Sequence, residues 1–83
     1  MKQRARTSKQ LGAIIRRERR KRQFTQAQLG QEIGLRQATI SKLEAGEPAT
    51  QLHTLLDVLT VLQLEIILEK RGKSSTKDIE ELF

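Results

Sequence analysis

The sequence predicts an all-α fold of four to five short helices, with a C-terminal β-strand that pairs across a homodimer. Between residues 8 and 62, apolar side chains recur at the helical spacing of three and four residues, interrupted by glycine and proline. Residues 64–69 then follow a period of two, which is typical of a strand. At 83 residues the chain has room for one small domain.

Composition excludes several classes of protein. The chain has no cysteine and a single histidine, His53, so we expect no disulfide, no metal site and no cofactor. Its carboxylates are scattered, and we therefore expect no enzymatic activity. No apolar run approaches the roughly 20 residues that span a bilayer, and no apolar signal-peptide core follows the basic N-terminus. We expect a cytoplasmic protein with no membrane partner.

Positive charge is concentrated near the N-terminus. Residues 1–24 carry ten basic side chains and one acid, Glu18, whereas the rest of the chain has six basic and nine acidic ones. A basic pole is the footprint expected for a polyanion partner, although charge alone favours a solvated charged face equally. A membrane-surface or RNA-binding segment is a weaker alternative, because the first helix has few strong apolar residues and no aromatic.

The first two helices have clear boundary signals. Residues 1–7 are polar and aperiodic, and we interpret them as a flexible basic arm. A helix is predicted from Ser8 to Arg22, capped by Thr7 or Ser8. The second begins at Thr25, which has the spacing of a capping box with Gln28, and ends at Gly34. The apolar stripe of the first helix is Leu11, Ile14 and Ile15.

Two further helices complete the prediction. The third runs over 37–44 and has only Ile40 and Leu43 as strongly apolar residues, so most of its surface is exposed. Gly46 ends it. Thr50 can cap a fourth helix with a wide inward face. That face consists of Leu52, Leu55, Leu56, Leu59 and Leu62.

The period-two segment predicts a homodimer. One short strand cannot satisfy its own backbone, and the chain has no second strand candidate. Pairing with the same strand of another copy solves this problem, while a continuation of the fourth helix is the alternative. The residues expected in the dimer strand are Leu64, Ile66, Ile67 and Leu68.

Residues 72–83 are interpreted as a flexible acidic tail, which follows the arm (1–7) and the domain (8–71). Ile79, Leu82 and Phe83 share one side at helical spacing, flanked by acids. A docking peptide for a protein partner has this pattern, and a frayed terminus explains it equally well.

The second and third helices, joined by a glycine turn, have the pattern of a helix-turn-helix. The second helix of such a pair packs by one edge and leaves small or polar side chains to enter a major groove about 12 Å wide. Gln can form hydrogen bonds with adenine, Arg can form them with guanine, and an Ala methyl can pack on the methyl group of thymine. The exposed candidates are Arg36, Gln37, Ala38, Ser41 and Lys42.

Residues 24–46 resemble the Xre family of phage-repressor DNA-binding domains. Residues 10–71 more narrowly resemble HipB-like antitoxins, chiefly through Gln37-Ala38-Thr39-Ile40-Ser41 and the strand at 64–69. The resemblance implies a lambda-repressor-like domain that represses its own operon and neutralises a HipA-like serine/threonine kinase toxin. A free-standing Xre-family regulator without a toxin is the alternative. The dimer implies an inverted-repeat operator in double-stranded DNA, with half-sites about one helical turn apart.

The resemblance also implies roles for single residues. Base edges are contacted by Arg36, Gln37, Ala38 and Ser41, and phosphates by Gln26, Lys42 and Arg16. For the Arg-rich end of the first helix, which includes Arg16, raising the local potential is an equal alternative to direct contact. Arg19 and Glu44 match a structural salt bridge between the first and third helices.

Two positions depart from the family pattern. Gly30 replaces the usual alanine, at a cost of roughly 0.5–1 kcal/mol of helix stability. Gln23 stands where glycine is frequent. Together they predict a marginally stable domain.

Overall fold

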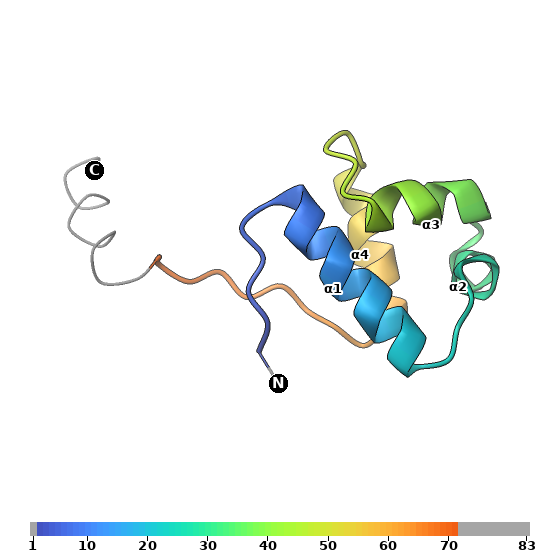
Figure 1. Cartoon of the computed structure of the whole chain (residues 1–83), viewed down its shortest axis with the longest axis horizontal. Coiled ribbons are helices and arrows are strands. Elements are labelled where there is room, and N and C mark those ends of the chain that lie inside the picture. Colours follow the sequence, from blue (N-terminus) through green and yellow to red (C-terminus); the bar gives the residue numbers. More distant parts are fainter. Residues whose placement is uncertain (1, 72–83) are drawn as a thin grey trace.

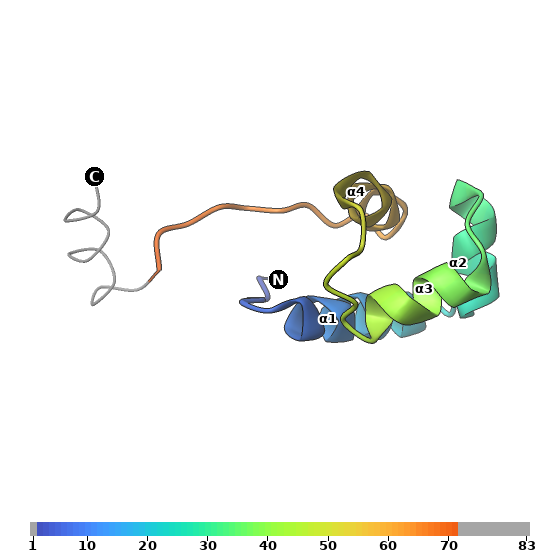
Figure 2. The same cartoon turned by 90° about the horizontal axis from the view of Figure 1, so that it is seen from above.

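The computed structural model describes residues 2–71 and contains four α-helices in that range (Figure 1). Their bounds are α1 (Ser8–Lys21), α2 (Gln26–Ile33), α3 (Gln37–Glu44) and α4 (Leu52–Val61). Seen from above, α1 and α3 share one layer, α4 forms a second layer, and α2 lies at one end (Figure 2). The all-α expectation is therefore confirmed. The tail residues Ile79, Leu82 and Phe83 lie outside the described residues.

Local capping signals fix the first two helices. The Thr7 side chain accepts a hydrogen bond from the Gln10 backbone N–H (3.0 Å) and so caps α1. At α2 the predicted capping box is present, because the Thr25 hydroxyl accepts from the Gln28 N–H and the Gln28 side chain accepts from the Thr25 N–H. Gly34 ends α2 in the left-handed conformation, with φ of +70°. These contacts fix the starts of α1 and α2, and Gly34 fixes the end of α2.

The core brings together side chains from all four helices. Residues Leu11, Phe24, Ile33, Leu35, Leu55, Val61 and Leu64 pack around it while partly exposed. Because each helix is short, each contributes only a narrow buried stripe. The fully or almost fully buried members are Ile15, Leu29, Ile40, Leu43, Val58, Leu59 and Leu62.

Two glycines allow close approach between backbone segments. A Cβ on Gly12 would lie 2.5 Å from the Glu44 carbonyl oxygen, so α1 crosses the end of α3 at this residue. A Cβ on Gly30 would lie 2.5 Å from the Leu35 carbonyl oxygen. Gly30 therefore also has a packing role that the sequence did not show, because the Leu35 carbonyl oxygen occupies the place that a methyl group would take.

The buried face of α4 differs from the predicted one. Of the predicted residues, Leu59 and Leu62 are buried and Leu55 is partly buried, but Leu52 and Leu56 are 66% and 44% exposed. Thr54 and Val58, which were not predicted, are buried instead. The leucine pattern was wider than the stripe that a ten-residue helix can bury against short neighbours.

The start of α4 also differs from the prediction. Gln51 occupies the N-cap position, but its side chain makes no capping hydrogen bond to the first turn of the helix. The predicted cap, Thr50, instead donates its hydroxyl hydrogen to the Glu47 carbonyl oxygen (2.9 Å). The turn that contains Pro48 therefore uses the hydroxyl that was expected to start the helix.

The chain leaves the helical path after α4. Gln63 has a φ of +59°, and residues 64–71 run away from the bundle as an extended trace (Figure 1). This overturns the alternative of a longer fourth helix. Leu64 stays against the core, while Ile66, Ile67 and Leu68 are 48%, 58% and 92% exposed. Pairing between copies is not tested by one chain, so the dimer strand stays a prediction.

The N-terminal arm contacts two parts of the domain. Lys2 Nζ lies 3.3 Å from Glu69 Oε1 of the extended segment. The Gln3 side chain donates to Glu18 Oε1 on α1 (3.0 Å). In this structure the arm therefore packs beside α1 and the segment that follows α4 (Figure 1).

Candidate nucleic-acid interface

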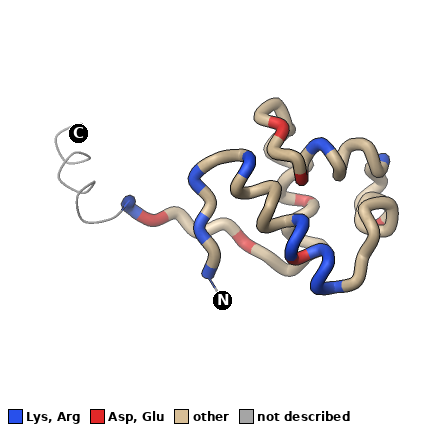
Figure 3. Tube along the Cα trace, viewed as in Figure 1, with Lys and Arg blue, Asp and Glu red and all other residues tan. Residues whose placement is uncertain are grey.

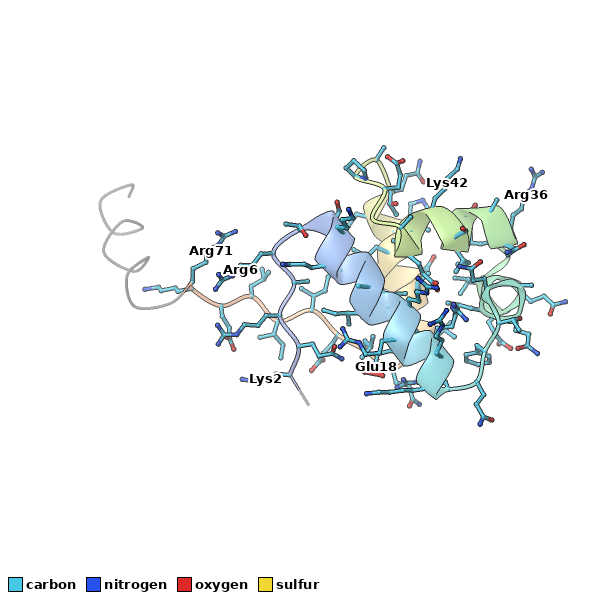
Figure 4. All side chains as sticks on the ribbon, in the orientation of Figure 1. Lys2, Arg6, Glu18, Arg36, Lys42 and Arg71 are labelled. Carbon is cyan, nitrogen blue, oxygen red and sulfur yellow. The ribbon has the colours of Figure 1, made fainter. Side chains whose placement is uncertain are left out.

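Helix α3 presents most of its surface to solvent. It buries Ile40, Leu43 and Glu44 on one edge, as the sparse apolar pattern predicted, with Glu44 as an additional buried residue. Arg36 and Lys42 project from the outer side of α3, away from α1 (Figure 4). The predicted base- and phosphate-contacting residues of this helix are all exposed: Arg36, Gln37, Ala38, Ser41 and Lys42.

A buried ion pair fixes α3 to α1. Arg19 donates from Nε to Glu44 Oε2 (2.6 Å) and from Nη2 to Glu44 Oε1 (3.0 Å), and the two side chains are only 9% and 3% exposed. Arg19 also donates from Nη1 to the Phe24 carbonyl oxygen (2.8 Å), and this bond joins α1 to the loop before α2. This two-point geometry confirms the expected structural salt bridge and holds both helices at a fixed angle.

The same carboxylate orients a residue at the start of α2. Gln26 donates from Nε2 to Glu44 Oε1 (3.1 Å). Its Oε1 in turn accepts from Gln37 Nε2 (3.0 Å). A chain of hydrogen bonds therefore runs from the buried ion pair through Gln26 to the exposed amide of Gln37.

This link between Gln26 and Gln37 was missed at the level of sequence. The two residues are eleven positions apart, in the first turns of different helices, and only the packing of α2 on α3 brings them together. A weak signal was available, since both helices carry glutamine at their first position. The link leaves the side-chain oxygen Oε1 of Gln37 and one hydrogen of its Nε2 free. This acceptor and donor are the two groups that recognition of adenine needs.

Basic side chains of α1 adjoin this position. Arg16 and Arg20 line a surface hollow together with Gln26 and Gln37. The structure thus brings three predicted contact residues, Arg16, Gln26 and Gln37, to one place. Lys42 lies elsewhere, near the C-terminal end of α3. Most of the Lys and Arg positions of α1 lie in its C-terminal half, with one more at its start (Figure 3).

The described residues carry no feature of two other kinds of site. Within 2–71, no cluster of three or more His, Asp or Glu side chains could hold a metal ion. None of the four helices in this range combines the length and hydrophobicity that a membrane crossing requires.

Comparison with known proteins identifies the family. The helix-turn-helix family model matches residues 15–75, which is more than half of the chain. The chain belongs to the Xre-type helix-turn-helix family. In this Xre-type domain, α2 and α3 are the two helices of the motif, joined by the turn at Gly34.

Among solved structures, this Xre-type domain is similar to HipB. A structure of a HipA-HipB-O2-O3 complex matches with 31% identity and a TM-score of 0.79, over 86% of this chain and 100% of the other. A HipB-O4 20mer complex gives the same values. So does a structure described as MDT Protein. A comparison with curated protein sequences found no match. The chain is therefore a helix-turn-helix protein of the HipB type.

Proposed function

We propose that this protein is a sequence-specific transcriptional repressor that reads double-stranded DNA with α3. The observation that carries the proposal is the hydrogen-bond chain from the Arg19–Glu44 pair through Gln26 to Gln37. It holds a base-reading amide in place on the exposed second helix of the motif before DNA arrives. A donor–acceptor pair that is already ordered loses little side-chain entropy on binding.

In the proposed complex, phosphate contacts fix the register and base contacts provide the specificity. Gln26 keeps one amide hydrogen for a phosphate oxygen at the N-terminus of α2, where backbone N–H groups also favour an anion. Arg16 and Lys42 supply charge on either side. Bases are read by Arg36, Gln37, Ala38 and Ser41.

The proposal includes a homodimer. Beyond Leu64, the extended segment carries exposed apolar side chains, and Leu52 and Leu56 add two more on α4. Extended backbone with apolar side chains is a template for pairing with another strand. Two copies joined at residues 64–69 would present two α3 helices to an inverted repeat whose half-sites lie about one helical turn apart.

We further propose that the protein is the antitoxin of a HipBA-type operon. The support is the likeness over most of the chain to HipB in a structure that also contains HipA. The partner would be a HipA-like serine/threonine kinase toxin, which the antitoxin neutralises in the cytoplasm while repressing its own operon on the nucleoid. A free-standing Xre-family regulator would keep the same DNA chemistry without that partner.

The DNA proposal is tested by selecting duplexes from a random library with the purified full chain. We expect enrichment of an inverted repeat by the natural protein and by Gln31→Ala, a control at an exposed glutamine of α2. Gln37→Ala should enrich a repeat that is degenerate at one position of each half-site. Selection of no common sequence by the natural protein would contradict the proposal.

The antitoxin proposal is tested by purifying the tagged protein from its native cells. A stoichiometric kinase-like protein should accompany it, and deletion of residues 73–83 shows whether Ile79, Leu82 and Phe83 dock that partner. Recovery of DNA without a kinase would favour the free-standing regulator.

A further inference from the structure

The solvent face of α1 carries basic side chains whose charge is not compensated nearby. Lys9, Arg16, Arg17 and Arg20 are exposed, and we call them the α1 cationic face. Within residues 2–71, none of these four has a carboxylate within ion-pair distance. The charge of this face is therefore available to an external partner.

The two acids nearest this face are already engaged. Glu18 is 8% exposed and pairs with Lys21 and Arg22. The carboxylate of Glu44 is buried against Arg19. Stabilisation of the helix dipole explains basic residues only in the last turn of α1. Lys9, Arg16 and Arg17 precede that turn, so their charge needs another explanation.

The α1 cationic face is continuous with the recognition surface. All four of its residues line a shallow hollow, with Ala13 between them and Ala45, the C-cap of α3, beside them. Glu44 also lines this hollow, but its carboxylate is the one that pairs with Arg19. Arg16 and Arg20 also line the neighbouring hollow that holds Gln26 and Gln37. From Lys9 to Arg20 the face extends for about 16 Å along the helix, enough for several phosphates. It therefore begins where the Gln26 phosphate contact is proposed and leads away from the bases.

We propose that the α1 cationic face binds the phosphate backbone of duplex DNA just outside the base pairs that α3 reads. The inference rests on the proposed function. The face has no apolar row for a membrane surface and no aromatic side chain for stacking on single strands. Each phosphate that it neutralises releases counterions, which adds roughly 0.9 to the slope of log K against log salt.

The test compares two duplexes and three proteins. One duplex is trimmed to the selected inverted repeat, and the other has about ten further base pairs, one helical turn, on each side. The variant is Lys9→Gln/Arg17→Gln, whose residues line only the outer hollow. The control, Lys70→Gln/Arg71→Gln, removes the same charge from the far end of the extended segment (Figure 4). Circular dichroism melting checks that each protein is folded.

For the natural protein and the control, we expect tighter binding and a steeper salt slope on the longer duplex. The α1 variant should lose about two units of slope per protomer on the longer duplex, one for each cation removed, and bind the trimmed duplex as the natural protein does. The inference would be overturned if the natural protein bound the longer duplex no more tightly than the trimmed one. It would also be overturned if the variant and the control lost the same amount of salt slope. If the natural protein selects no duplex at all, the proposed function fails. The inference can then be tested on random DNA, where an unchanged slope of log K against log salt for the α1 variant, relative to the natural protein, would still overturn it.

Discussion

At the scale of a single residue, Glu44 joins the buried ion pair to a residue of the proposed DNA-binding surface. Its carboxylate accepts two hydrogen bonds from Arg19 and one from Gln26, and its side chain is 3% exposed. Removal of one partner of such a pair leaves a buried charge without compensation, whereas replacement of both by apolar groups can cost little. We therefore expect stability and the proposed DNA recognition to depend differently on the same carboxylate.

This difference gives a testable prediction. Arg19→Met should lower the free energy of unfolding by about 3–5 kcal/mol, and the double variant Arg19→Met/Glu44→Leu should recover part of that loss. Urea denaturation measures both. The recovered double variant should still discriminate poorly between DNA sequences, because Gln26 has lost its acceptor. Full DNA specificity in the double variant would show that the hydrogen-bond chain does not orient Gln37.

At the scale of the element, the junction between α1 and α2 is constrained by its backbone. Gln23 has a φ of +59°, a conformation that L-residues adopt at a cost. Its N–H donates to the Arg20 carbonyl oxygen (3.0 Å), and the Phe24 N–H donates to that of Arg19 (3.2 Å). These bonds join the end of α1 to the loop that carries the capping residue of α2, so the junction is fixed although one residue is strained.

Gln23→Gly should therefore raise the free energy of unfolding by up to about 1 kcal/mol, because glycine adopts positive φ without a steric penalty. Thermal denaturation measures the change. The matched variant Gln23→Ala keeps a Cβ and should bring no gain. Equal stabilisation by both variants would point to the glutamine side chain, and not the backbone, as the source of the strain.

The helices show how far sequence reasoning reaches. The bounds of α3 agree with the prediction and those of α1 within one residue, because caps, glycine stops and apolar spacing are local signals. The exposed outer side of α3 was predictable for the same reason. The Gln26–Gln37 link, the crossing at Gly12 and the rotated face of α4 were not, since each depends on how separate helices pack.

At the scale of the whole molecule, the described residues have the proposed recognition surface at one end and unpaired extended backbone at the other (Figure 1). The last backbone N–H in the described part that donates to another backbone group is that of Leu64, to the Leu59 carbonyl oxygen (2.8 Å). The N–H groups of 65–71 are thus available to a second copy. Dimerisation through this segment would set the spacing between two α3 helices without changing either domain.

Ile66→Pro should convert the proposed dimer into a monomer, because proline has no N–H to donate to a neighbouring strand. Since residue 66 lies outside the helices, the domain should keep its helical circular dichroism. Sedimentation analysis at micromolar concentration measures the change, with Ile66→Thr as a control that retains the N–H and a β-branched side chain. A monomeric natural protein, or a proline variant that remains dimeric, would contradict pairing through this strand.

The central claim is that Gln37, held by Gln26, reads a base. The most direct measurement is the affinity of Gln37→Ala for the selected inverted repeat and for random DNA of equal length and at equal salt, beside Gln31→Ala. We predict a loss of about 1–3 kcal/mol on the repeat for Gln37→Ala, little change on random DNA, and no loss on either for the control. Equal losses of Gln37→Ala on both DNAs would contradict base reading by this residue.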